Sequence, residues 1–175
     1  MNIMKKIGAA GLAFVTGACM LAGCSREKHS RGPLELKKVT YVCYAGDVEE
    51  VSVYVFTPDL KLREYEIYPE NVGKYDYPEG ELPPEDQYTL KEYDIEETYW
   101  NNLALVFTRV NIMELDEEIP EGKGYDLEST YIRVETEDAV NKTGGYGAGL
   151  EDDSVSRRYR SAEEAIQYAL SNKQP

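Results

Sequence analysis

The amino-acid sequence predicts an α+β domain, with an antiparallel β-sheet built of hairpins and two helices packed on one face. Short runs rich in β-branched and aromatic residues are separated by turn residues, as in antiparallel strands. One longer stretch repeats apolar residues at helical spacing, and strands occur in groups before and after it. This order favours an antiparallel sheet with helices on one side over a parallel sheet. A length of 175 residues fits one such domain.

The N-terminus predicts export and a lipid anchor. Residues 1–23 carry two lysines near their start, Lys5 and Lys6, and the apolar stretch that follows is shorter than the roughly 20 residues of a membrane-spanning helix. The run Leu21-Ala22-Gly23-Cys24 resembles the lipobox of bacterial lipoproteins. That resemblance implies a signal peptide over 1–23, acylation of Cys24 (with palmitate, for example), and a lipid-anchored protein on the extracytoplasmic face of the cell membrane. An ordinary secreted protein with an incidental cysteine is the alternative.

Residues 24–33 predict a flexible tether, because they have few apolar groups and no periodicity. Their excess of Arg and Lys suits contact with anionic lipid headgroups, and a simple soluble linker is the other interpretation. His29, the one histidine of the chain, lies in this tether, away from any expected site. Residues 34–175 then form a single α+β domain.

Three strands are expected at the start of this domain. Residues 38–44 and 48–56 predict a hairpin, and residues 60–68 return as a third strand after a proline-containing turn. Successive side chains of a strand point to opposite faces of the sheet. In the second strand, one face therefore carries Val51, Val53 and Val55, and the other carries Tyr54 and Phe56.

Residues 69–87 predict a long loop that is the candidate contact surface. They contain four prolines, two glycines and six acids, without a helix or strand pattern. Prolines limit the entropy lost on binding, tyrosines offer rigid aromatic area, and the acids favour a basic partner. A disordered, solvated loop that binds nothing is the alternative. The candidate contact residues are Tyr75, Asp76, Tyr77, Glu79 and Glu81.

A strand at 88–93 and the first helix are expected next. Apolar residues recur at helical spacing from Ile95 to Val110, with Leu103 on the buried stripe, and Asn111 is a plausible left-handed stop. The run Asp94-Ile95-Glu96-Glu97 has the form of a capping box, which predicts that Asp94 caps this helix.

A second hairpin and a second helix complete the expected fold. Residues 130–136 and 140–146 predict paired strands. The glycine-rich run 144–149 lacks the strand–helix context of a dinucleotide-binding loop, and it predicts a close approach of backbones instead. Ser161-Ala162-Glu163-Glu164 predicts the cap of the last helix.

The chain beyond the lipobox also resembles small lipoproteins of Gram-positive anaerobes. This resemblance rests on a Tyr-rich opening hairpin, on YDIEETYW at the start of the first helix, and on STYIRVETEDAVNKTGGYGAG before the last one. It implies no activity and supplies no functional residues.

Composition excludes several classes of function. A net charge of −14 is unfavourable for nucleic-acid binding, because phosphate contacts need Lys and Arg. One His and three Cys supply few ligands and nucleophiles, so the sequence predicts no metal, no cofactor and no enzyme activity. Cys43 falls within a strand and is interpreted as a small buried hydrophobe rather than a reactive thiol.

The expectation that follows is a membrane-anchored extracytoplasmic lipoprotein that acts as a non-catalytic binding or interaction module. All 15 tyrosines lie after residue 40, and tyrosine is an efficient contact residue. The expected partners are the bilayer, through acylated Cys24, and a basic protein or envelope component. Two alternatives stay open: a carboxylate-based hydrolase of envelope glycans, and an acidic inhibitor or immunity-like protein for a cationic partner. A cleft with two facing carboxyl groups and stacking aromatics would favour the hydrolase.

Overall fold

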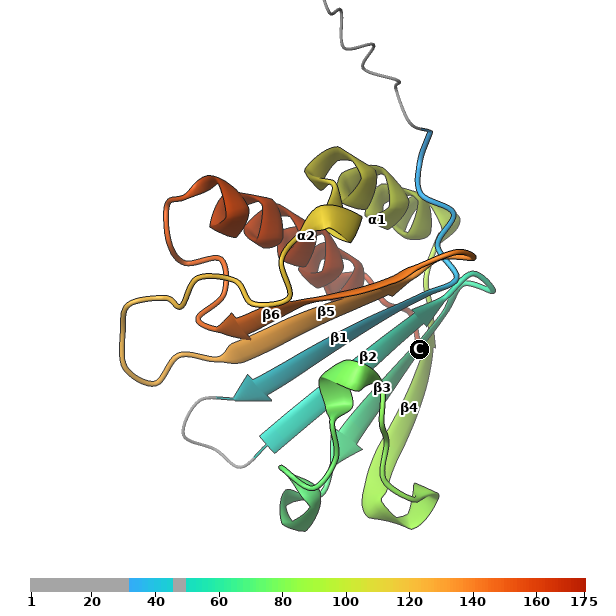
Figure 1. Cartoon of the computed structure of the whole chain (residues 1–175). Helices are drawn as coiled ribbons and strands as arrows, with labels where there is room; N and C mark the ends of the chain where they lie inside the picture. The colour runs from blue at the N-terminus through green and yellow to red at the C-terminus, as the bar shows by residue number, and fades with distance from the viewer. Residues whose placement is uncertain (1–31, 46–49) are drawn as a thin grey trace, which may run out of the picture. The chain divides into compact units, whose positions relative to one another are not determined.

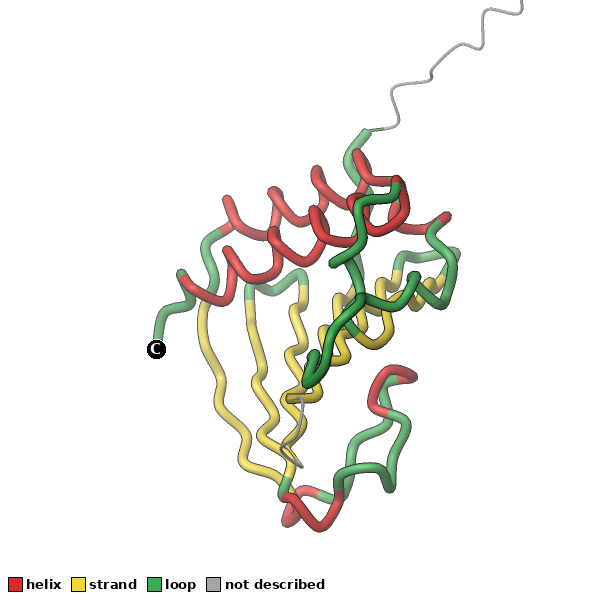
Figure 2. Tube along the Cα trace, turned by 90° about the vertical axis from the view of Figure 1, so that its left-hand side faces the viewer, coloured by secondary structure: helices red, strands yellow, loops and turns green. Residues whose placement is uncertain are grey.

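The computed structural model describes residues 32–45 and 50–175, and it confirms the α+β class. In these residues six antiparallel strands form one sheet, and helices α1 (Glu97–Val110) and α2 (Ser154–Ser171) lie side by side on one face of it (Figures 1 and 2). Cys24 and the predicted signal peptide lie outside the described residues. The strands are β1 (Lys38–Ala45), β2 (Glu50–Thr57), β3 (Lys61–Ile67), β4 (Tyr88–Asp94), β5 (Ser129–Glu135) and β6 (Val140–Tyr146).

Sequential strands pair as predicted, and one further pairing organises the sheet. β1 pairs with β2, β2 with β3, β3 with β4, and β5 with β6. β1 also pairs with β5, with Val42 opposite Tyr131, so the strand order is β4-β3-β2-β1-β5-β6. This pairing joins the two halves of the chain and places their side chains next to each other on the same faces.

Both faces of the sheet are covered, each by a different part of the chain. The larger core lies between the sheet and the helices, and it includes Leu103, Phe107 and Ile166, all fully buried. The predicted division of β2 into a valine face and an aromatic face is confirmed, because the two sets belong to different cores. The core on the second face consists of Val42, Val51, Val53, Ile67 and Tyr77.

The second face is covered by residues 69–87, the cover loop, which crosses in front of β2 and β3 in Figure 1. It contains three short 3₁₀ turns. The ring of Tyr77 is fully buried against the sheet, and its hydroxyl donates to the Asn71 carbonyl at 2.7 Å. The prediction that Tyr77 lies on an exposed contact surface is therefore wrong. The valines of β2 need a cover on this face, and a large aromatic ring supplies it.

Helix α1 begins later than predicted. Its first residue is Glu97, and its N-cap, Glu96, makes no side-chain capping bond. Asp94 does not cap the helix, because it is the last residue of β4, where its carboxylate pairs with Lys61 and its backbone pairs with Gln174. The predicted stop is confirmed, since Asn111 is left-handed with φ = 54°.

Helix α2 begins about two turns earlier than predicted. Ser161 lies inside the helix, and the N-cap is Asp153, whose carboxylate accepts from the backbone N–H of Ser156 at 2.9 Å. The polar first turns are held by tertiary contacts: Tyr159 is fully buried, and Arg158 donates to the last carbonyls of α1. A local capping pattern carries no information about such contacts.

Gly144 in β6 confirms the expected close approach of backbones. A Cβ atom here would lie 2.2 Å from the carbonyl oxygen of Thr130 and 2.7 Å from the Cα of Tyr131. On its other side, Gly144 exchanges backbone hydrogen bonds with residues 117–119, which cover the edge of β6. The glycine is therefore required by the packing of the sheet.

The described residues belong to one compact unit with its own cores. Such a unit folds without the residues that precede it, so residues 34–175 suit experiments on the isolated domain. Within the described ranges, no helix combines the length and the apolar character needed to cross a bilayer.

Candidate functional site

Four tyrosines, two from the strands and two from the cover loop, form a row between the loop and the sheet. Tyr131 of β5 and Tyr44 of β1 have ring centroids 6.1 Å apart, because β1 and β5 are neighbours in the sheet. The row continues from Tyr44 to Tyr77 at 6.4 Å, and from Tyr77 to Tyr75 at 6.1 Å. Tyr77 is buried and fixes the row to the core, whereas the other three rings are half-buried.

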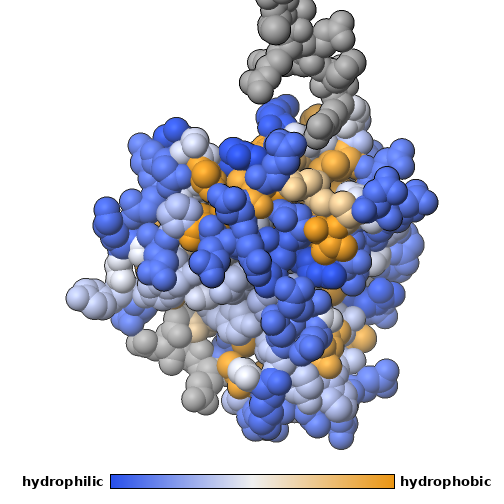
Figure 3. All heavy atoms as spheres, in the orientation of Figure 1, coloured by the Kyte–Doolittle hydropathy of each residue, from blue (hydrophilic) through white to orange (hydrophobic). Residues whose placement is uncertain are grey.

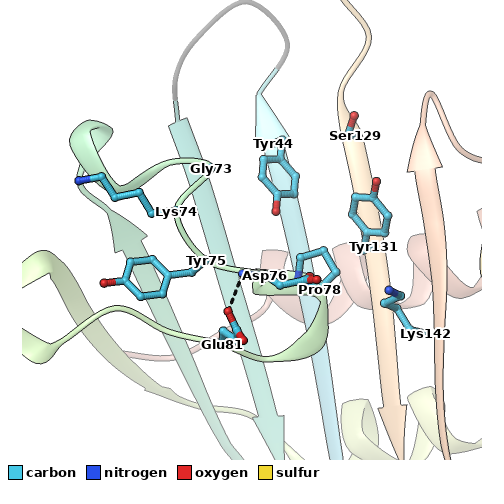
Figure 4. Close-up of a pocket in the computed structure, with 10 residues that line it drawn as sticks. All are labelled: Tyr44, Gly73, Lys74, Tyr75, Asp76, Pro78, Glu81, Ser129, Tyr131 and Lys142. Carbon is cyan, nitrogen blue, oxygen red and sulfur yellow. Dashed lines mark hydrogen bonds between the residues drawn. The ribbon is translucent and has the colours of Figure 1, made fainter.

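The three half-buried tyrosines line an open pocket of ≈ 740 Å³ between the cover loop and the sheet (Figure 4). A volume of this size is typical of ligand sites. The surface on this side is mainly hydrophilic, with apolar residues in small separate groups (Figure 3). The pocket therefore offers aromatic and polar groups rather than a broad apolar surface. The loop contributes Lys74, Tyr75, Asp76 and Glu81, and the strands contribute Tyr44, Ser129, Tyr131 and Lys142.

Two carboxylates hold the turn of the cover loop at the pocket. Asp76 accepts from the backbone N–H of Glu79 at 3.2 Å, and Glu81 accepts from the backbone N–H of Asp76 at 2.9 Å (Figure 4). Gly80 ends this turn in the left-handed region, with φ = 86°. Asp76 and Glu81 remain exposed, so the turn places two negative charges at the pocket.

Lys142 joins three segments at the β6 side of the pocket. Its ammonium lies 2.6 Å from a carboxylate oxygen of Glu79 in the cover loop, and 2.6 Å from one of Glu117 in the segment that covers β6. These hydrogen bonds, first that with Glu117 and then that with Glu79, raise the pKa of Lys142. The residue is therefore charged at neutral pH and holds the loop to the sheet.

A second hollow of ≈ 360 Å³ adjoins the pocket and shares Ser129, Tyr131 and Lys142 with it. Its remaining lining comes from β6 and from the segment that covers β6. Three further acids lie along it: Glu117, Glu118 and Glu121. The two adjacent hollows, together called the channel below, are lined by tyrosine rings and by more carboxylates than ammonium groups.

Another group of titratable residues lies on the helix face. Tyr41 donates to Glu163 at 2.9 Å, and the Cys43 thiol donates to Glu128 at 3.7 Å. Burial, followed by the charge of Glu128, raises the pKa of Cys43 to about 12. A thiol that stays protonated at neutral pH is a poor nucleophile. Cys43 is half-buried against the core, which agrees with a packing role.

Two carboxylates of this group share a small hollow. Burial raises the pKa of Glu163, and the hollow of ≈ 290 Å³ that it lines with Glu128 has no aromatic ring among its lining residues. In the tyrosine pocket, the carboxylates of Asp76 and Glu81 both come from one turn of the cover loop. The small hollow therefore lacks a stacking ring, and the tyrosine pocket lacks carboxylates from two separate segments.

Two runs of consecutive acids, 116–118 and 151–153, have structural partners. Asp153 caps α2, and Glu117 pairs with Lys142. Across the described ranges, no group of three or more His, Cys, Asp or Glu side chains is arranged to hold a metal ion.

The structure brings together most of the predicted contact residues. Tyr75, Asp76 and Glu81 line the pocket, Glu79 reaches it through Lys142, and Tyr77 lies behind it in the core. Sequence reasoning missed the residues that the strands contribute, Tyr44, Ser129, Tyr131 and Lys142. Strand alternation assigns each of them to a face, but only the pairing of β1 with β5 shows that these faces coincide.

Comparison with known proteins finds no matching family model and no similar sequence among curated proteins.

Proposed function

We propose that this chain is a lipid-anchored lipoprotein on the extracytoplasmic face of the cell membrane, and that it binds a basic partner without catalysis. The anchor is supported by the lipobox resemblance at Cys24. One observation supports the binding role: tyrosines from three separate segments line a single open pocket together with two exposed carboxylates of the cover loop. Tyrosine presents a large, rigid and amphipathic contact area at low entropic cost.

The hydrolase alternative has less support. Retaining and inverting glycosidases place two carboxyl groups on either side of the scissile bond. Asp76 and Glu81 belong to one turn, and both accept backbone hydrogen bonds that fix that turn. An acidic inhibitor for a cationic partner would use the same pocket as the binding module, so the two functions differ in the consequence of binding rather than in the site.

The anchor is tested by Cys24→Ala in cells that carry the lipoprotein pathway. We expect the variant to take up no labelled fatty acid and to accumulate as unprocessed precursor, because the modified thiol is absent. Gel mobility and fatty-acid labelling measure both effects, with Cys19→Ala as the matched control. Continued labelling of the Cys24→Ala protein would refute the assignment.

The binding role is tested with residues 34–175 as bait against solubilised cell envelope. We expect Tyr44→Ala to reduce capture of a partner about ten-fold, the loss that removal of one aromatic contact produces. Tyr168→Ala is the matched control, since this tyrosine is 56% exposed on α2, away from the pocket. Circular dichroism of each variant checks that it folds. Equal capture by wild type and Tyr44→Ala would place the binding surface elsewhere.

A further inference from the structure

We propose that the tyrosine pocket accepts a lysine or arginine side chain of an extended basic peptide, with the rest of that peptide lying along the second hollow. This inference rests on the proposed function, because it names the ligand class of the same pocket. It is carried by the charges that line the channel, by an internal example of the same chemistry, and by the continuity of the two hollows.

The charges along the channel select a cation. Asp76 and Glu81 line the pocket together with Lys74 and Lys142. Lys142 is neutralised by two further carboxylates, those of Glu79 and Glu117. The second hollow adds Glu118 and Glu121. Acids therefore outnumber bases over the whole channel, and an anionic ligand would be repelled.

The rings provide a second attraction for the same ligand. A cation over the face of a tyrosine is attracted by the ring quadrupole, and the attraction grows when the cation loses water. Tyr44 and Tyr131 meet edge to face, with an angle of 81° between their planes. This arrangement leaves ring surface of both residues at the pocket, beside the carboxylate of Asp76 (Figure 4).

The chain itself shows how these groups hold an ammonium. On the helix side of the sheet, the ammonium of Lys173 lies 2.5 Å from a carboxylate oxygen of Glu64 and 4.2 Å from the ring centroid of Tyr93. The ring centroid of Tyr54 lies 5.8 Å away. One carboxylate and two tyrosines therefore bind a lysine in this fold. The open pocket presents the same set of groups with room for a lysine from another molecule.

The length of the channel favours a peptide over a small cation. The pocket and the second hollow meet at Ser129, Tyr131 and Lys142, so one ligand can contact both. A single ammonium group would contact the ring of only one tyrosine. The acids of the second hollow would then have no cation of the ligand beside them. An extended chain with cationic side chains at alternate positions brings charges to both hollows, because alternate side chains point the same way.

Fluorescence anisotropy with residues 34–175 tests the ligand class. The probes are labelled nine-residue peptides in which lysine alternates with alanine, and otherwise identical peptides with glutamine or glutamate in place of lysine. We expect the lysine peptide to bind at least ten-fold more tightly than the glutamine or glutamate peptide. Its affinity should fall as NaCl rises from 50 to 500 mM. Spermidine as competitor distinguishes a small cation from a peptide, and it should displace the probe only at concentrations far above that of unlabelled peptide.

Matched variants locate the site. Glu81→Gln removes one charge but keeps an acceptor for the backbone of Asp76, and it should weaken binding by about two- to five-fold. Glu70→Gln makes the same change in the same loop away from the pocket lining, and it should leave binding unchanged. Tyr44→Ala should weaken binding by about ten-fold, whereas Tyr44→Phe, which keeps the ring, should not.

The outcomes separate this inference from the proposed function. Equal binding of the lysine and glutamine peptides, or equal effects of Glu81→Gln and Glu70→Gln, would overturn the basic-peptide class. Spermidine that competes as well as the peptide would overturn the peptide in favour of a small cation. In each of these cases, a captured envelope partner that is still lost with Tyr44→Ala would leave the binding function standing.

Discussion

Leu103→Ala is expected to lower the free energy of unfolding of residues 34–175 by about 2–5 kcal/mol. Leu103 is fully buried in the core between α1 and the sheet, so its truncation removes apolar contacts and leaves a cavity that rigid neighbours fill only in part. Denaturant unfolding followed by circular dichroism measures the change.

Leu105→Ala is the matched control for this prediction. Leu105 lies in the same helix two residues later, but it is 47% exposed and points away from the sheet. The same chemical change there should alter the free energy of unfolding by less than about 1 kcal/mol, because most of the side chain already contacts water. Similar effects of the two substitutions would mean that α1 packs through another face.

Lys173→Ala is expected to destabilise the domain by about 2 kcal/mol, between the losses for an exposed and for a fully buried ion pair, because the side chain of Lys173 is partly exposed. Glu64 is 8% exposed, so it would remain as a buried carboxylate without its ammonium partner. Glu64→Gln in the Lys173→Ala background removes that charge and should recover part of the loss. Lys91→Ala breaks an exposed pair with Glu66 instead, and it should cost less than about 1 kcal/mol.

The same ion pair predicts a pH dependence. Burial alone would lower the pKa of Lys173, but the hydrogen bond and the charge of Glu64 outweigh it and raise the pKa. A group whose pKa is higher in the folded state stabilises that state fully at any pH below its unfolded pKa, which is about 10.4 for lysine. This contribution is lost as the pH rises through the folded pKa. The difference in stability between wild type and Lys173→Ala should therefore persist from pH 7 to 9 and shrink above about pH 10.5. A difference that already shrinks between pH 7 and 9 would contradict the ion pair.

Strands and their faces were predictable because their signals are local. Alternation in β2 separated Val51 and Val53 from Phe56, and the two sets do lie in different cores. The end of α1 was also predictable, because Asn111 tolerates the left-handed conformation that the stop requires. Each of these features depends on side chains within a few residues of each other.

Features that depend on distant contacts were not predictable. Asp94 matches a helix cap in the local pattern, yet pairing with β3 keeps it in a strand. Ser161 also matches a cap, but contacts of Arg158 with the end of α1 extend α2 past it. The sequence pattern around Tyr77 predicts an exposed residue. Its burial depends on the valines of β2, which are distant in the sequence, so the local pattern does not reveal it.

The candidate site also has a part that local sequence predicts and a part that depends on distant contacts. Its loop half was visible as a tyrosine- and acid-rich segment, and Tyr75, Asp76 and Glu81 do line the pocket. Its strand half, with Tyr44 and Tyr131, exists only because β1 and β5 are neighbours, and no local pattern in either strand specifies that pairing.

Strand β1 also sets the direction in which the pocket points. The chain enters the domain at Leu34, whose backbone N–H donates to Thr108 of α1 at 2.8 Å, and Tyr44 stands near the far end of β1 (Figure 1). The seven residues of extended strand from Lys38 to Tyr44 span roughly 20 Å. The point where the chain enters the domain and the pocket therefore lie toward opposite ends of β1. A ligand in the pocket would lie about 20 Å from the residues that lead into this strand.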